Sequence, residues 1–144
     1  MEFKRIIEIK NEEDTRAFGL TLAEEALPGT VYALIGDLGT GKTTLTKSIA
    51  EGLGIERHIT SPTFTIVNEY LGDRTLIHFD MYRLGSADEL FDIGWEDYLA
   101  RGAVCAVEWS ENVEEAFYGD EIILTIEKTS DTSRKITIEG ADVC

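Results

Sequence analysis

The 144-residue sequence has little cysteine and no apolar run of membrane-spanning length. Its two cysteines, Cys105 in an apolar stretch and Cys144, are too few and too poorly matched for a disulfide framework, which indicates a reducing compartment. No segment approaches the roughly 18 to 20 apolar residues of a transmembrane helix, and no apolar stretch of signal-peptide length follows residues 1–5, Met-Glu-Phe-Lys-Arg. We therefore expect a soluble, cytoplasmic protein.

Basic residues are also scarce. The sequence has 13 lysines and arginines against 28 acidic residues, so its formal net charge is -15 at pH 7. A net negative charge of this size repels nucleic-acid backbones and anionic membranes, which argues against direct binding to either by this chain alone. An acidic surface either keeps a protein soluble or attracts a basic protein partner, and composition leaves both interpretations open.

The first third of the sequence has the pattern of an α/β domain. Apolar and polar residues alternate over 3–9, as in a strand. Asn11 followed by Asp14 predicts the N-terminus of a helix, which stops before Pro28 and Gly29. The apolar run 31–35 is typical of a buried parallel strand. The spacing of Leu45, Ile49 and Leu53 then predicts a helix that Gly54 ends.

The rest of the sequence predicts more strands than helices. Strand patterns occur at residues 64–70, 75–80, 103–109, 121–127 and 135–139, and a helix is predicted over 88–99. The turn-like residues 71–74 and 129–131 predict two hairpins. No internal repeat or linker interrupts residues 1–144, so we expect a single domain. The predicted fold is α/β, P-loop NTPase-like, with a mixed sheet that has a parallel centre, antiparallel additions and helices on both faces.

One motif carries specific chemistry. Gly36, Gly41, Lys42 and Thr43 fit the pattern G-x-x-x-x-G-K-[ST], placed between an apolar strand and a helical pattern. Glycines let the backbone N-H groups curl around phosphates, and the helix that follows adds the positive end of its dipole. Lys42 is expected to reach the β- and γ-phosphates and the Thr43 hydroxyl to ligate Mg²⁺. The predicted nucleotide-binding run is Asp37, Leu38, Gly39, Thr40, Gly41, Lys42, Thr43 and Thr44.

A P-loop needs an acidic partner at the end of a neighbouring strand, to hold Mg²⁺ and orient the attacking water. Asp80 ends the strand pattern 75–80, and Glu108 lies at the end of the pattern 103–109. Carboxyl ends of strands in an open α/β sheet converge on the ligand crevice, so we expect both carboxylates at one mouth. His78 shares a strand face with Asp80, and we interpret it as a hydrogen-bonded core histidine without a catalytic role.

Other classes of P-loop protein fit less well. A small-molecule kinase usually closes an arginine-bearing lid, whereas the arginines after residue 43 are scattered; they are Arg57, Arg74, Arg83, Arg101 and Arg134. The sequence does not support assignment as a GTPase, because it has no Asn-Lys-x-Asp element to bind guanine. A nucleotide-gated interaction module, in which hydrolysis is incidental, has the same sequence features as a working ATPase and stays open.

Several segments together resemble the TsaE family, also called YjeE. The P-loop 36–44 is similar to the family's, with Thr40 where alanine is more usual. Residues 60–64, Thr-Ser-Pro-Thr-Phe, match its switch-like segment, and 78–84 match its H-x-D-x-Y-R-L signature. The pairs at 89–90, 93–94 and 97–98 recur at the expected spacing, and 107–109 supply Val-Glu-Trp. The first strand and the last hairpin match only in outline.

The resemblance implies a slow, partner-dependent ATPase of tRNA threonylcarbamoyladenosine (t6A) biosynthesis. Its partners would be TsaD and TsaB, which transfer the threonylcarbamoyl group to tRNA, while the ATP cycle resets that complex between turnovers. By analogy Thr43 and Glu108 ligate Mg²⁺, Lys42 contacts the phosphates, and Asp80 acts near the γ-phosphate or its water. Asn11 and Arg134 are assigned to the surroundings of the adenine.

The resemblance also implies switch or partner contacts. Thr60, Ser61 and Thr63 would belong to a loop that responds to the γ-phosphate. Tyr82 and Arg83 are either a surface pair or groups that reach a phosphate or a partner carboxylate. Trp109 either packs under a helix or presents an apolar face at the crevice mouth, where nucleotide binding would change its surroundings.

Overall fold

The computed structural model describes residues 2–27, 29–36, 42–55, 67–80, 97, 100, 102–108 and 121–141. Their strands form one seven-stranded sheet with the order β1-β7-β6-β2-β5-β4-β3. The bounds are β1 Glu2–Ile9, β2 Val31–Ile35, β3 Val67–Tyr70, β4 Leu76–Asp80, β5 Val104–Glu108, β6 Ile122–Lys128 and β7 Arg134–Ala141. These agree with the predicted strands to within a few residues, except that positions 64–66 and 109 lie outside the described ranges.

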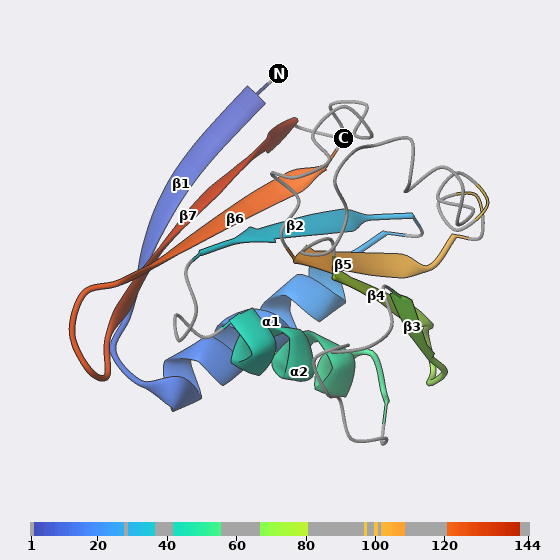
Figure 1. Ribbon diagram of the computed structural model, residues 1–144, viewed down its shortest axis with the longest axis horizontal. Helices are drawn as coiled ribbons and strands as arrows, with labels where there is room; N and C mark the ends of the chain where they lie inside the picture. Colours follow the sequence, from blue (N-terminus) through green and yellow to red (C-terminus); the bar gives the residue numbers. More distant parts are fainter. Residues whose placement is uncertain are drawn as a thin grey trace.

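The middle of the sheet is parallel and its flanks are antiparallel. Strand β2 pairs in parallel with β5 and β6, and β5 pairs in parallel with β4. Both predicted hairpins are present, because β3 pairs antiparallel with β4, and β6 with β7. Strand β1 extends the second hairpin by pairing antiparallel with β7, so it forms one edge of the sheet (Figure 1). The mixed α/β fold class expected from the sequence is confirmed.

Helix α1, Glu12–Glu25, begins as the sequence predicts. The Asn11 side chain accepts a hydrogen bond from the Asp14 N-H at 2.9 Å, and the Asp14 carboxylate accepts one from the Lys10 N-H at 3.1 Å. This reciprocal cap satisfies N-H groups that have no partner within the helix. At the other end of α1, the Arg74 guanidinium donates to the carbonyls of Ala23 and Ala26 at 3.1 and 2.7 Å.

Helix α2, Lys42–Gly52, starts at the P-loop lysine and ends near Gly54. Gly54 has a φ of 79°, the left-handed conformation that glycine adopts without strain. Its N-H donates to the Glu51 carbonyl, and the Ile55 N-H donates to the Ala50 carbonyl, both at 3.1 Å. This is a Schellman motif, which satisfies the last carbonyls of the helix.

Both described helices lie on the same side of the sheet (Figure 1). Leu22, Leu45 and Ile49 pack there against inward-facing strand residues such as Leu34 and Leu124 in one buried cluster. The opposite face of the central strands is buried too, through Ala33, Phe79, Cys105 and Val107. The predicted helix 88–99 lies almost entirely outside the described residues; Asp97 and Ala100 are helical.

A close contact between α1 and α2 depends on glycine. A Cβ atom at Gly19 would lie 2.3 Å from the Cβ of Ser48 and 3.1 Å from the backbone nitrogen of Ile49, so a side chain there would force the helices apart. Exposed Arg16 and Glu51 form an ion pair across the same helix interface. The contact holds α2, and with it the end of the P-loop, against α1.

We expect Gly19→Ala to destabilise the protein. Overpacking costs about 1 to 3 kcal/mol, which exceeds the gain of at most about 1 kcal/mol from replacing a helical glycine. Thermal or urea unfolding measures the difference. Thr21→Ala, on an exposed part of the same helix, is the matched control and should change the free energy of unfolding by less than about 0.5 kcal/mol. A Gly19→Ala protein as stable as the parent would contradict the close packing.

Candidate functional site

The candidate site lies at the carboxyl ends of β2, β5 and β4. Strand β2 ends at Ile35, directly before Gly36 of the P-loop motif, and α2 begins at Lys42. In the sheet register Glu108 is paired with Leu34 of β2 on one side and with Asp80 of β4 on the other. The sequence prediction that Asp80 and Glu108 lie together at the same edge is therefore confirmed for their backbone positions.

Two buried charged side chains mark this edge. Lys42 and Glu108 are each 6% exposed, although lysine and glutamate are rarely buried unless an opposite charge or a hydrogen-bonding partner compensates the desolvation. Lys42 belongs to the first turn of α2, and Glu108 is the last residue of β5. A buried cation and a buried carboxylate beside a P-loop are the groups that a phosphate and its metal ion require.

Glu108 has a buried partner on the neighbouring strand. The Nε2 atom of His78 lies 2.6 Å from the Oε2 atom of Glu108, and His78 is fully buried. This confirms the prediction of a hydrogen-bonded core histidine, but it also identifies a partner that the sequence did not reveal. The two residues are 30 positions apart and on different strands. Their pairing depends on strand order and register, which residue spacing does not encode.

One described carboxylate at this edge of the sheet, that of Glu108, could hold a metal ion. Among the described ranges, no three histidine, cysteine, aspartate or glutamate side chains cluster as a metal site. Mg²⁺ commonly keeps several waters and binds through one or two carboxylates plus substrate phosphates. Glu108 could supply such a carboxylate, and Thr43 belongs to the first turn of α2. The side chains of Thr43 and Asp80 lie outside the described part of the structure.

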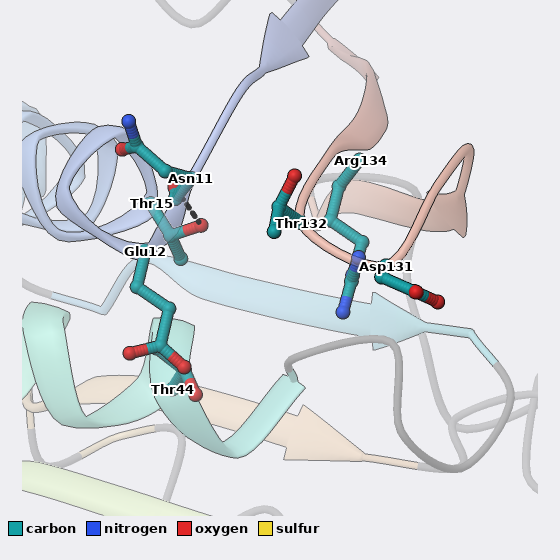
Figure 2. Close-up of a pocket in the computed structure, with 7 residues that line it drawn as sticks. All are labelled: Asn11, Glu12, Thr15, Thr44, Asp131, Thr132 and Arg134. Atoms are coloured by element: carbon teal, nitrogen blue, oxygen red, sulfur yellow. Dashed lines mark hydrogen bonds between the residues drawn. The ribbon is translucent and has the colours of Figure 1, made fainter.

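A separate cavity of about 330 Å³ opens between α1, α2 and the turn that joins β6 to β7 (Figure 2). Its lining includes three residues that the sequence assigned to nucleotide binding: Asn11, Thr44 and Arg134. The other lining residues are Glu12, Thr15, Asp131 and Thr132. The cavity thus joins segments that are far apart in the sequence, and Thr44 connects it to the first turn of α2.

Side chains in the cavity differ in how they face it. The Asn11 side-chain amide points away from Arg134, because its oxygen caps α1 (Figure 2). The backbone carbonyl of Asn11 accepts a hydrogen bond from the Thr15 hydroxyl at 3.4 Å. The Arg134 guanidinium is anchored to the turn, where it donates to the carbonyls of Ser130 and Ser133 at 2.9 and 2.8 Å. Glu12 extends from α1 towards Thr44.

Sequence reasoning missed Glu12, Thr15, Asp131 and Thr132. Their types are ordinary for the first turn of a helix and for a hairpin turn, so no motif distinguishes them. The signal in the sequence is indirect: each lies within four positions of Asn11 or Arg134, which are predicted to lie near the adenine.

One of the arginines that could form a kinase lid has a different role in the structure. Arg74 donates to two carbonyls at the C-terminal end of α1, so its side chain serves that helix end and does not form part of a lid. Arg134 lines the cavity. The remaining candidates, Arg57, Arg83 and Arg101, lie outside the described residues.

A family model described as "Threonylcarbamoyl adenosine biosynthesis protein TsaE" matches residues 9–136. This chain belongs to the TsaE family. It is 45% identical over 128 residues to the tRNA threonylcarbamoyladenosine biosynthesis protein TsaE of Bacillus subtilis, covering 88% of this chain and 80% of that protein. The protein of the same name from Aquifex aeolicus is 36% identical over 141 residues, covering 96% and 98% of the two chains.

A solved structure has a similar fold. The crystal structure of Bacillus subtilis YdiB is similar with a TM-score of 0.83 and 38% sequence identity, covering 97% of this chain and 87% of that one. The resemblance to the TsaE family expected from the sequence is thereby confirmed. Within the described ranges, no helix combines the length and the apolar character that crossing a membrane requires.

Part of the predicted TsaE-like site lies outside the described residues and stays a prediction. In the P-loop these are Asp37, Leu38, Gly39, Thr40 and Gly41. In the switch or partner set they are Thr60, Ser61, Thr63, Tyr82, Arg83 and Trp109.

Proposed function

We propose that this TsaE-family chain binds ATP with Mg²⁺, hydrolyses ATP, and acts on a TsaD–TsaB complex to reset it between rounds of tRNA t6A modification. The observation that supports this most directly is the burial of Lys42 and Glu108 at the strand edge that adjoins the P-loop motif. The names of its relatives place them in t6A biosynthesis. The roles of TsaD and TsaB come from the family resemblance.

Each residue has a distinct role in the proposed reaction. The Lys42 ammonium binds the β- and γ-phosphate oxygens, and the Thr43 hydroxyl and Glu108 carboxylate hold Mg²⁺. When bound, Mg²⁺ supplies charge neutralisation on the phosphate oxygens. Asp80, the register partner of Glu108, accepts a hydrogen bond from the attacking water and orients it. The helix α2 N-terminus adds a favourable dipole for the phosphates.

The cavity beside Thr44 is the proposed site of the nucleoside. Thr44 directly follows the residue that would hold Mg²⁺, so a nucleotide with its phosphates at the P-loop can extend its base into this cavity. Arg134 offers a planar guanidinium on which a base can stack. Asn11 contributes by fixing the first turn of α1 through its cap, since its amide is directed away from Arg134.

We expect Arg134→Ala to weaken ATP binding by roughly 2- to 30-fold, the equivalent of a cation–π contact of about 0.5 to 2 kcal/mol. Lys135→Ala is the matched control, because successive strand residues face opposite sides and Lys135 lies near Glu127, at 3.8 Å, rather than in the cavity. Calorimetric titration with ATP measures both variants. An equal loss of ATP affinity in Arg134→Ala and Lys135→Ala would contradict the assignment of Arg134 to the base site.

The proposed function is tested by phosphate release and by t6A formation, with and without TsaD, TsaB and tRNA. We expect slow ATP turnover by the isolated chain, faster turnover with the complex, and sustained t6A formation only with hydrolysable ATP. Equal t6A formation with a non-hydrolysable analogue would favour a nucleotide-gated interaction module. Failure of the chain to bind ATP at all would overturn the proposal.

A further inference from the structure

His78 is a fully buried polar residue without a role in the proposed reaction. It lies in the middle of β4, between the apolar residues Ile77 and Phe79, which are also fully buried. Its Nδ1 atom is buried and has no hydrogen-bond partner among the described residues. Its Nε2 atom makes the 2.6 Å contact with Glu108. An apolar residue would fill the same core space without the cost of burying a ring nitrogen, so the contact with Glu108 is the feature that histidine adds.

The sheet register explains how the two side chains meet. His78 is paired with Ala106, and the next pair on the same face is Asp80 with Glu108. On the β5 side Ala106 carries only a methyl group, so no large side chain fills that register position; on the β3 side His78 is paired with Asn68. The imidazole extends to the diagonal neighbour, Glu108, a separation that long side chains bridge across adjacent strands.

The contact determines the direction of the Glu108 carboxylate. An ionised carboxylate only accepts hydrogen bonds, so Nε2 carries the proton and donates to Oε2. With Oε2 held on the β4 side, rotation of the carboxylate is restricted, and Oε1 together with the second lone pair of Oε2 can still accept a ligand. Hydrogen bonds of this kind to metal-binding carboxylates orient them before the metal arrives.

We propose that His78 is a positioning residue, which holds the Glu108 carboxylate in the orientation that binds the magnesium ion of the nucleotide complex. The inference rests on the proposed function, because it needs Glu108 to be a metal ligand. It goes beyond that function by assigning Mg²⁺ affinity to a residue that touches neither the metal nor ATP.

Two substitutions of similar polarity separate positioning from general support of the core. In His78→Gln the side-chain amide nitrogen reaches the place of Nε2 and can still donate to Glu108. In His78→Asn the amide nitrogen lies near the place of Nδ1, too far from Glu108. Leu76→Ala, on the same face of β4, is the control for loss of core packing, since Leu76 is fully buried and donates nothing to Glu108.

The measurement is calorimetric binding of a non-hydrolysable ATP analogue at a series of Mg²⁺ concentrations and in EDTA. We expect His78→Asn to raise the Mg²⁺ concentration needed for tight binding by about 10- to 100-fold, the usual effect of removing a partner of a metal ligand. Affinity in EDTA should stay unchanged. In His78→Gln the Mg²⁺ concentration needed for tight binding should return close to that of the parent, and in Leu76→Ala it should equal that of the parent.

A second readout needs no nucleotide. The chain has two histidines, His58 and His78, so ring ¹⁵N spectra can be assigned with His58→Gln. We expect a slowly exchanging Nε2 proton on His78 that is lost in Glu108→Ala.

Parental Mg²⁺ dependence in His78→Asn, or a His78 ring without a proton on Nε2, would overturn the inference while the proposed function stands. Absence of any Mg²⁺ effect in the parent would instead overturn the proposed function and the role of His78 with it.

Discussion

Replacing Glu108 with glutamine is expected to reduce Mg²⁺-dependent ATP hydrolysis by about 100-fold or more while the fold is retained, because a metal ion stabilises transition-state charge by several kcal/mol. The amide keeps an oxygen that accepts from Nε2 of His78, so the buried hydrogen bond survives and only the charge is lost. Phosphate release over a range of Mg²⁺ concentrations, together with circular dichroism, measures the two effects separately.

Glu108→Ala provides the contrast. It removes the charge and also leaves a buried N-H without an acceptor, which costs about 1 to 3 kcal/mol of stability in addition to activity. Asp80→Ala should abolish hydrolysis without raising the Mg²⁺ requirement. If Asp80→Ala raises that requirement and Glu108→Gln does not, the two carboxylates have the opposite roles. Hydrolysis at the parent rate in both would contradict the active site.

Lys42→Ala is expected to weaken ATP binding by roughly 10- to 150-fold, because hydrogen bonds to charged groups are worth about 1.5 to 3 kcal/mol. Lys42 is only 6% exposed, so its charge is poorly screened by water, and a hydrogen bond from its ammonium group to a phosphate oxygen would be strong there. Calorimetric titration with Mg²⁺-ATP measures the loss.

Lys47→Ala is the control for Lys42→Ala. Lys47 is exposed on the same helix, so its replacement makes the same change in net charge away from the site. Its ATP affinity should equal that of the parent. Unchanged affinity in Lys42→Ala would contradict the P-loop assignment.

Local patterns in the sequence were sufficient for the described helices and strands and for the edge of the sheet where the candidate site lies. The Asn11 cap, the Gly54 stop and the apolar run of β2 each depend on interactions within a few residues, and the structure has all three. The convergence of Asp80 and Glu108 followed from a rule about parallel strands.

Contacts between distant segments could not be predicted in the same way. The bond from His78 to Glu108 requires β4 and β5 to be neighbours in one particular register, and no residue spacing encodes that choice. The same holds for the cavity. Arg134 meets the first turn of α1 because β7 inserts between β1 and β6, an arrangement that the two separate strand patterns left undetermined.

The pairing of β1 with β7 has a consequence for how the chain acquires its ligand. Ile9 and Arg134 are register partners at the last pair of that ladder, so the segments on both sides of the cavity are brought together by the least local contacts of the sheet. During synthesis the P-loop and α2 leave the ribosome long before β7 does. A growing chain therefore contains the proposed phosphate-binding residues before it contains Arg134 and the rest of the β6–β7 turn that lines the cavity. Under the proposed function, full affinity for the nucleotide requires the completed sheet, and a bound nucleotide would stabilise the first and last strands, β1 and β7, against local unfolding.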